Sequence, residues 1–181
     1  MPRIFAFVTH KAGVADDTAF EMPAAAAKID AAARPTAIVA GCGPELDAVC
    51  ESLRATYPEV WKLAAGALVY PNAELVRQAL VRVLPADGIL LASHDHFGMD
   101  LAPGLAVKMN WAYVPDVVGI EGARGSCLGL VRQEFGGQVS VRIDCDISSG
   151  AVFTIRPGAF GRQRIGDRDR LILPGDGCAG S

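Results

Sequence analysis

Short apolar runs alternate with amphipathic segments over the first two thirds of the chain. Four apolar runs rich in β-branched and aliphatic residues predict strands: 4–8, 36–40, 61–64 and 89–92. Apolar residues at helical spacing predict helices over three intervening ranges: 18–33, 44–57 and 72–83. A fourth helix is expected to begin at Asp100, with Pro103 in its first turn, and to end near Asn110. Right-handed crossovers between such strands predict a parallel sheet with helices on both faces.

The pattern changes after Asn110, where short β-like runs are separated by glycine turns. The predicted strands are 112–120, 127–132, 139–146 and 151–155. Within 139–146, apolar and polar residues alternate, which indicates one covered and one polar face. We therefore expect an α/β fold with a three-layer, Rossmann-like parallel sheet of the nucleotide-hydrolase type over about residues 1–115, followed by a strand-rich C-terminal extension. One domain is expected over 1–160, and the glycine- and aspartate-rich segment 161–181 is expected to be a tail or linker.

The composition and charge of the chain limit the kinds of molecule that it can bind and the compartment in which it is expected. The chain has 181 residues, is 51% hydrophobic and carries a net charge of −3, so it has no basic field that would attract nucleic acid. No apolar run reaches the roughly 18 residues that a membrane helix needs, and the first apolar run is too short for a signal-peptide core. Five scattered cysteines with no zinc spacing are typical of reduced thiols, which predicts a cytoplasmic location.

Three segments carry a family resemblance. They read GMDLAPGLA at 98–106, RQEFGGQ at 132–138 and TIRPGAF at 154–160. In the same order they resemble the Gly-x-Asp-Leu-Ala-Pro-x-Leu-Ala, Arg-Pro-x-x-Gly-Gly-Asn and Thr-Val-Arg-Pro-Gly-x-Phe elements of the electron-transfer flavoprotein alpha subunit. Gly104 stands where that family commonly has arginine, and Gln138 where it has asparagine. The resemblance covers about residues 1–160 and implies the N-terminal domain of the alpha subunit.

The resemblance implies an electron-carrier subunit or scaffold, not an enzyme, that forms a heterodimer with a beta-like or flavin-bearing partner. The family's FAD lies mainly in a second domain of the alpha subunit that has no counterpart in this sequence, so we expect FAD in the assembled complex and not in this chain alone. Arg132 and Arg156 stand beside glycine turns, and the resemblance makes them interface arginines. Association with further copies of the same chain, as a homo-oligomer, is an alternative expectation.

A nucleotide pocket is the alternative function. Parallel sheets bind ligands at the carboxyl ends of their strands, and the polar residues that follow the first and fourth predicted strands suit a nucleotide such as AMP. The candidate pocket residues are His10, His94, Asp95, His96, Gly98 and Asp100. Asp100 is expected to cap its helix, whose N-terminus would face phosphate.

A metal-dependent hydrolase is the second alternative. His94, Asp95 and His96 offer imidazole and carboxylate ligands, and His10 could approach them across the sheet. The spacing matches no recognised metal motif, and adjacent serine, histidine and aspartate at 93–95 cannot form a catalytic relay by themselves. The Gly41-Cys42-Gly43 turn lacks the third glycine of a dinucleotide loop. We therefore predict no metal site and no catalytic residue.

Overall fold

The computed structural model of the chain describes residues 2–162. Its four α-helices are α1 (Met22–Ile29), α2 (Gly43–Leu53), α3 (Ala73–Val83) and α4 (His96–Met109). Its strands are β1 (Ile4–Val8), β2 (His10–Lys11), β3 (Val14–Ala15), β4 (Thr36–Gly41), β5 (Glu59–Ala64), β6 (Ile89–Ser93), β7 (Ala112–Arg124), β8 (Cys127–Glu134), β9 (Val139–Asp146) and β10 (Ala151–Ile155). Three short 3₁₀ turns are η1 (Asp17–Phe20), η2 (Gly66–Leu68) and η3 (Phe135–Gly137).

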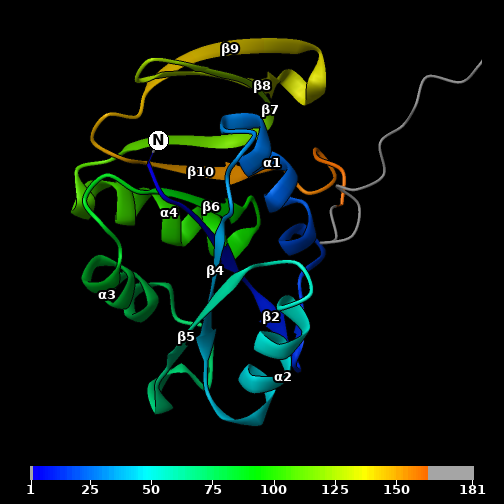
Figure 1. Cartoon of the computed structure of the whole chain (residues 1–181), viewed down its shortest axis with the longest axis vertical. Coiled ribbons are helices and arrows are strands. Elements are labelled where there is room, and N and C mark those ends of the chain that lie inside the picture. The colour runs from blue at the N-terminus through cyan, green and yellow to red at the C-terminus, as the bar shows by residue number, and fades with distance from the viewer. Residues whose placement is uncertain (1, 163–181) are drawn as a thin grey trace, which may run out of the picture.

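The main sheet has eight strands in the order β5-β4-β1-β6-β10-β7-β8-β9. In this order, the first six strands, β5 through β7, pair in parallel. At the other edge, β8 pairs antiparallel with β7, and β9 pairs antiparallel with β8. Helices α1 and α2 cover one face, and α3 and α4 cover the other (Figure 1). The expected α/β fold with a Rossmann-like sheet in three layers is confirmed.

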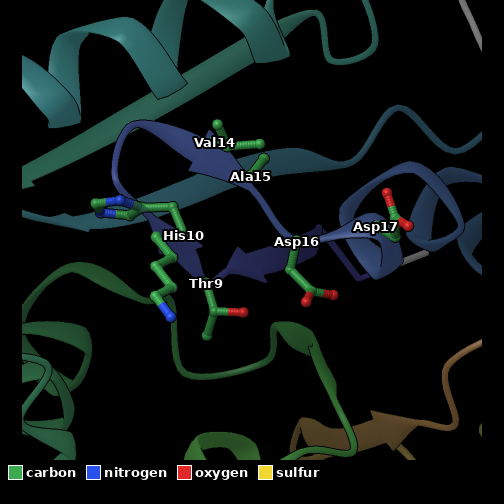
Figure 2. A pocket seen from close by; sticks show the side chains of 7 residues that line it. Thr9, His10, Val14, Ala15, Asp16 and Asp17 are labelled. Carbon is green, nitrogen blue, oxygen red and sulfur yellow. The ribbon is translucent and has the colours of Figure 1, made fainter.

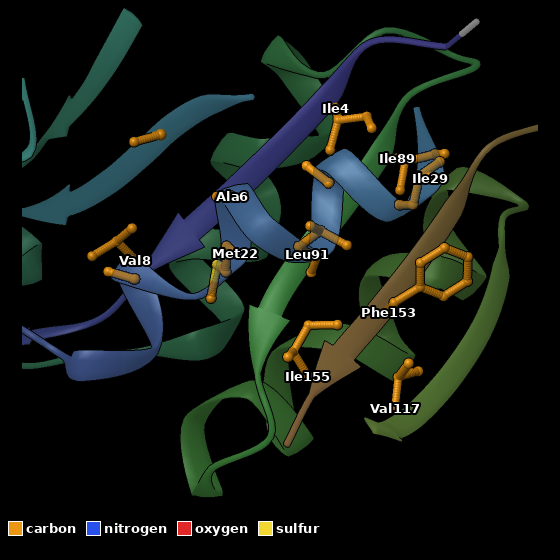
Figure 3. Close-up of a cluster of buried hydrophobic side chains, with 14 of the residues drawn as sticks. Ile4, Ala6, Val8, Met22, Ile29, Ile89, Leu91, Val117, Phe153 and Ile155 are labelled. Carbon is orange, nitrogen blue, oxygen red and sulfur yellow. The ribbon is translucent and has the colours of Figure 1, made fainter. Parts of the chain in front are cut away.

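Alternation along the buried strands divides the core into two halves. In β1, Ile4, Ala6 and Val8 pack on the side of α1 and α2. Phe5 and Phe7 pack on the side of α3 and α4. All five β1 residues are buried, which is the pattern of a central parallel strand covered on both faces. Figure 3 shows the first half of the core, where side chains of β1, β6 and β10 meet those of α1.

The strand-rich part of the chain is not an appendage. β10 comes last in sequence, yet it lies between β6 and β7 and pairs in parallel with both. The sheet core therefore extends beyond the 1–115 expected from the sequence. The physical reason is that β10, with all five residues buried, supplies the apolar surface that closes the sheet between two earlier strands.

Helix α4 begins four residues earlier than expected. Asp95, not Asp100, is the N-cap, and its Oδ1 accepts a hydrogen bond from the Gly98 N–H at 2.7 Å. Pro103 consequently lies inside the helix and not in its first turn. The expected end of the helix is confirmed, because Asn110 adopts the left-handed conformation with φ 55° and donates to the Ala106 carbonyl.

Two further local differences concern the segment after β1. The sequence pattern predicts no strand over residues 9–17, but β2 and β3 pair there as a small antiparallel ribbon. The expected helix over 18–33 is divided into η1 and the shorter α1, and Pro23 lies in the first turn of α1. Of the predicted tail 161–181, residues 163–181 lie outside the described residues.

Candidate functional site

Side chains from four strands converge at the carboxyl ends of β6 and β10. We call this group the strand-end cluster: His94, Asp116, Gln133, Thr154 and Arg156. Thr154 is at its centre and is fully buried. Its Oγ1 lies 2.9 Å from His94 Nδ1 and accepts a hydrogen bond from the Asp116 N–H at 3.0 Å. The hydroxyl therefore joins the end of β6 to the middle of β7.

Arg156 completes the cluster through a bidentate ion pair. Its Nε and Nη2 donate to the two carboxylate oxygens of Asp116 at 2.8 and 2.5 Å, and its Nη1 donates to Gln133 Oε1 at 2.6 Å. These hydrogen bonds from Arg156 hold the pKa of Asp116 below its usual range, and Asp116 in turn raises the pKa of Arg156. His94 Nε2 lies 3.9 Å from Asp116 Oδ1, so an imidazolium at this position would face a carboxylate.

The backbone of Asp116 has to be unusual for this arrangement to form. Asp116 adopts φ +58°, and the pairing of β7 with β10 shifts register between Phe153 and Ile155. Aspartate is among the residues that tolerate the left-handed region best, and the bulge turns its carboxylate toward Arg156.

The segment 154–160 is held at its other end by Glu21, the residue before α1. This carboxylate is 6% exposed and accepts hydrogen bonds from the Gly158 N–H at 3.0 Å and the Phe160 N–H at 3.2 Å. Gly158 has φ +83°, a conformation that glycine adopts without a steric cost. The third resemblance segment is therefore a turn fixed from both sides, by Asp116 and by Glu21.

Arg132, the other expected interface arginine, lies near this cluster on β8. Its Nη2 pairs with Glu134 at 2.9 Å, while its Nε is buried without a hydrogen-bond partner among the described residues. The next residue after Glu134 is Phe135, which is 78% exposed and adopts φ +51°. A bulky aromatic side chain therefore projects from the β8–β9 turn into solvent.

The remaining candidate residues of the β6–α4 segment belong to the start of helix α4 and not to the cluster. Asp95 caps α4, and His96 is the exposed first residue of the helix. Gly98 is buried, and a Cβ placed there would lie 1.9 Å from the Ser93 carbonyl oxygen. Asp100 lies on the exposed face of α4, 3.8 Å from Arg77. Of this segment, only His94 therefore reaches the strand-end cluster.

The space beside Gly104 is filled by a side chain from a neighbouring helix. Arg77 of α3 lies across α4, and its Nη2 donates to the Asp100 carbonyl at 2.6 Å. A Cβ at Gly104 would lie 2.5 Å from Arg77 Nε. The absence of a side chain at 104 therefore makes room for a guanidinium that comes from α3.

His10 lies apart from the cluster, in an open cavity of about 400 Å³ at the end of β1. We call it the hairpin pocket, and its lining residues are Thr9, His10, Lys11, Val14, Ala15, Asp16 and Asp17. His10 Nε2 lies 3.1 Å from the Ala40 carbonyl oxygen, and its Nδ1 is buried without a partner among the described residues. Figure 2 shows Thr9 and Asp16 pointing to the same side of the ribbon, with Val14 and Ala15 pointing away from it. None of the other five candidate pocket residues lines this cavity.

Within residues 2–162, no three His, Cys, Asp or Glu side chains converge to form a metal-binding group. The four cysteines of that range are free thiols: Cys42, Cys50, Cys127 and Cys145. The described part of the chain also contains no helix with the length and apolar character needed to cross a membrane. Cys178 lies outside the described residues.

Sequence reasoning found His94 and Arg156 but missed the groups that join them. Asp116 follows Pro115 within a β-like run, and a proline–aspartate pair is the local signal that could have indicated an irregular strand. Gln133 and Thr154 stood within the resemblance segments. Glu21 gave no signal, because its partners lie 137 and 139 residues away in the sequence.

No curated protein matches the chain significantly. The family model described as the electron transfer flavoprotein domain matches residues 4–170. This match spans the whole described sheet, including the strand-end cluster and the three resemblance segments. By its sequence, therefore, the chain belongs to the electron transfer flavoprotein family.

Proposed function

We propose that this chain acts as an alpha-like subunit of an electron transfer flavoprotein, a scaffold that docks a beta-like or flavin-bearing partner. The observation that carries the proposal is the family match over residues 4–170, since proteins of this family carry electrons in complexes. Electron transfer needs proximity and orientation of the redox centres, and the subunit itself does not have to make or break bonds.

The strand-end cluster supports a scaffolding role. Arg156 and Asp116 satisfy each other, and Thr154 bonds both His94 and the Asp116 backbone. Asp95 is used as a helix cap. The polar groups that the sequence offers for chemistry are thus engaged in holding strand ends and turns in place, which makes a rigid platform.

The partner is proposed to dock at the β8–β9 turn, next to the cluster. Phe135 is 78% exposed there, and the neighbouring Val139 is 45% exposed. Large aromatic residues with arginine nearby are enriched in the cores of protein interfaces. Arg132, whose Nε has no partner among the described residues, lies at the same end of β8 and supplies that arginine.

FAD is proposed to be held by the partner or in the assembled complex. The hairpin pocket, the cavity described above, does not fit a flavin dinucleotide. Its volume of about 400 Å³ is near the lower end for ligand sites, and its lining includes two carboxylates, Asp16 and Asp17, whose charge disfavours the two phosphates of a dinucleotide. No electron-transfer step is therefore assigned to a flavin inside this chain.

Affinity capture from extract of the source cells, followed by mass spectrometry and a visible absorption spectrum, tests the proposal. We expect a beta-like family member to co-purify together with flavin absorbance. Phe135→Asp is expected to lower the recovered flavin absorbance at least about tenfold, as for an interface hot spot. Tyr70→Asp is the matched control, because Tyr70 is 80% exposed on the segment before α3. Capture of no flavin-bearing protein would refute the subunit function.

A second candidate function is the binding of an adenine mononucleotide such as AMP in the hairpin pocket. The specific observation is that His10, whose buried Nδ1 has no partner among the described residues, lines the same cavity as Lys11, whose ammonium suits a phosphate group. Asp16 could accept ribose hydroxyl groups at the other side of the cavity. Calorimetric titration with AMP, ATP and FAD tests it, with His10→Ala as the expected loss-of-binding variant. Absence of heat and of any thermal shift with all three ligands would exclude this function.

A further inference from the structure

Strand β9 forms the free edge of the main sheet. It pairs with β8 on one side, and it is the last strand in the sheet order, so among residues 2–162 nothing pairs with its other side. Figure 1 shows β9 as the outermost strand, at the end of the molecule opposite α2. An unpaired edge presents a row of backbone donors and acceptors to any strand of matching pattern.

The hydrogen bonds of β8 and β9 fix which residues face outward. The Ile147 N–H donates to the Ser126 carbonyl at 2.8 Å, in the same register that pairs Cys127 with Asp146 and Leu128 with Cys145. In an antiparallel ladder every second residue bonds to the same neighbour. The odd-numbered residues of β9 therefore bond to β8, and the N–H and C=O groups of the even-numbered residues 140, 142, 144 and 146 point to the free edge.

The side chains of β9 also divide by parity. The odd-numbered residues are apolar and lie on the core face, where Ile143 and Cys145 pack against the cluster of buried residues. The even-numbered residues lie on the outer face and are exposed: Ser140, Arg142, Asp144 and Asp146. A positive and a negative side chain, Arg142 and Asp144, therefore lie two residues apart on the outer face of β9.

This pattern is complementary to itself in one antiparallel register. With a two-fold axis at Ile143, Arg142 lies opposite Asp144 of a second copy, and Asp144 lies opposite the second copy's Arg142. Moving the axis to Arg142 would place two arginines opposite each other, and moving it to Asp144 would do the same with two aspartates. Like charges directly opposite destabilise a strand pair. Of these three axes, only the one at Ile143 gives two opposite-charge pairs with no like charges directly opposite, and it also aligns the outward-facing backbone groups.

We propose that the chain self-associates through β9, forming a two-fold symmetric dimer in which the two sheets join edge to edge. The apolar face agrees with this register. Val141 comes opposite Cys145 of the second copy, and Val139, which is 45% exposed in one chain, comes opposite Ile147. The dimer continues an existing apolar row across the axis, so it covers side chains that one copy leaves partly exposed.

Charge on an edge strand often serves to prevent pairing, and the arrangement of the charges here argues against that role. A blocking edge carries charges that repel a second copy. Arg142 instead lies 3.0 Å from Glu121 and 3.7 Å from Asp144, so its guanidinium is already held in the outer face of the sheet. Its five donors are enough to serve a further carboxylate across the axis.

Charge exchange tests the register. Sedimentation velocity of the full chain over a concentration series is expected to give twice the chain mass of 18.9 kDa. Asp144→Arg and Arg142→Asp should each raise the dimer dissociation constant on the order of tenfold or more. The double variant, with both changes, should restore the dimer. Asp47→Arg is the matched control, because its side chain is 65% exposed, against 66% for Asp144, and it lies on α2.

A cross-link supplies a test that does not depend on charge. Ile143→Cys places two thiols opposite each other at a non-hydrogen-bonded pair, where the Cα separation suits a disulfide. Oxidation should give a covalent dimer on a non-reducing gel, and Val139→Cys should not, since residue 139 does not meet itself. A chain that stays monomeric at its highest soluble concentration would overturn the proposal. A dimer that Asp144→Arg leaves intact would also overturn it.

The outcome is separable from the proposed docking of a flavin-bearing partner. Phe135→Asp addresses the β8–β9 turn and is read by flavin absorbance, whereas Asp144→Arg addresses the strand edge and is read by mass. Failure of either result leaves the other unaffected.

Discussion

Replacement of Gly98 by alanine is the sharpest test of how the β6–α4 connection is built. A Cβ at this position would lie 1.9 Å from the Ser93 carbonyl oxygen and 3.1 Å from the Ser93 carbonyl carbon. Ordinary carbon–oxygen contacts are no closer than about 3.3 Å, so one of the two backbone segments must move by more than 1 Å. Neither is a flexible side-chain end, because Ser93 belongs to the buried strand β6 and Gly98 to the first turn of α4.

The cost can be estimated from two contributions. Overpacking of a tightly packed site costs about 1–3 kcal/mol, and contact with backbone places this case at the upper end. The displacement also strains the Asp95 cap, whose loss costs about 1 kcal/mol. We expect Gly98→Ala to lower the free energy of unfolding by about 3–4 kcal/mol, out of the roughly 5–15 kcal/mol of a typical domain. For a chain of this length the melting temperature should fall by about 6–16 °C.

Urea unfolding followed by far-ultraviolet circular dichroism measures this change, with the m-value checked for constancy. Gly66→Ala is the matched control, because a Cβ at Gly66 would meet nothing within 4 Å, and we expect a change within about 0.5 kcal/mol. A Gly98→Ala protein as stable as the wild type would show that the helix start is not held against Ser93 in the way described.

Three further predictions concern polar groups that are buried or half-buried. Arg156 lowers the pKa of Asp116 in the folded state, so the stability that this carboxylate contributes is complete above its unfolded pKa of about 4 and is lost as pH falls through the lower folded pKa. Asp116→Asn should therefore reduce the loss of stability at acid pH, measured by urea unfolding at a series of pH values. An unchanged loss of stability at acid pH would contradict the ion pair. Burial raises the pKa of Tyr57, whose hydroxyl donates to the Ala19 carbonyl, so stability should fall as pH rises above about 10. Tyr57→Phe should lower the free energy of unfolding by about 1 kcal/mol at neutral pH and should remove that part of the loss of stability at alkaline pH. A loss at alkaline pH as steep as that of the wild type would exclude Tyr57 as its source. Glu21→Ala should leave the Gly158 and Phe160 N–H groups without their acceptor, which should lower the free energy of unfolding by about 2–3 kcal/mol and speed hydrogen exchange at both amides. Glu45→Ala is the control. Unaltered exchange at both amides in Glu21→Ala would contradict the role of Glu21.

The sequence by itself determined the class of fold and most of the elements of the main sheet. Apolar runs of four or five residues predicted the central parallel strands β1, β4 and β6, because a strand that is buried on both faces is apolar at nearly every position. Helical spacing located α3 and the start of α2 to within one residue, although α2 ends at Leu53 and not at residue 57. Asn110 marked the end of α4 through its tolerance of the left-handed conformation. The three resemblance segments likewise indicated the family that the residue 4–170 match establishes.

Local patterns were less decisive where two residues competed for one role. Both Asp95 and Asp100 can cap a helix, and Pro103 in a first turn favoured Asp100. The contact between Gly98 and the Ser93 carbonyl settled the matter, since it brings the chain into the helical conformation immediately after β6. A backbone contact of this kind leaves no trace in composition or periodicity.

Only the tertiary structure decided where the late strands lie and which polar groups meet. The insertion of β10 between β6 and β7 brings Thr154 to His94 and Arg156 to Asp116, across separations of 60 and 40 residues. Strand order depends on the total apolar surface that the folded sheet can bury, which is a property of all its strands together. Short-range sequence patterns report the conformation of a segment, but the pairing of distant segments is set by packing, and so the polar cluster could not be derived from the residues alone.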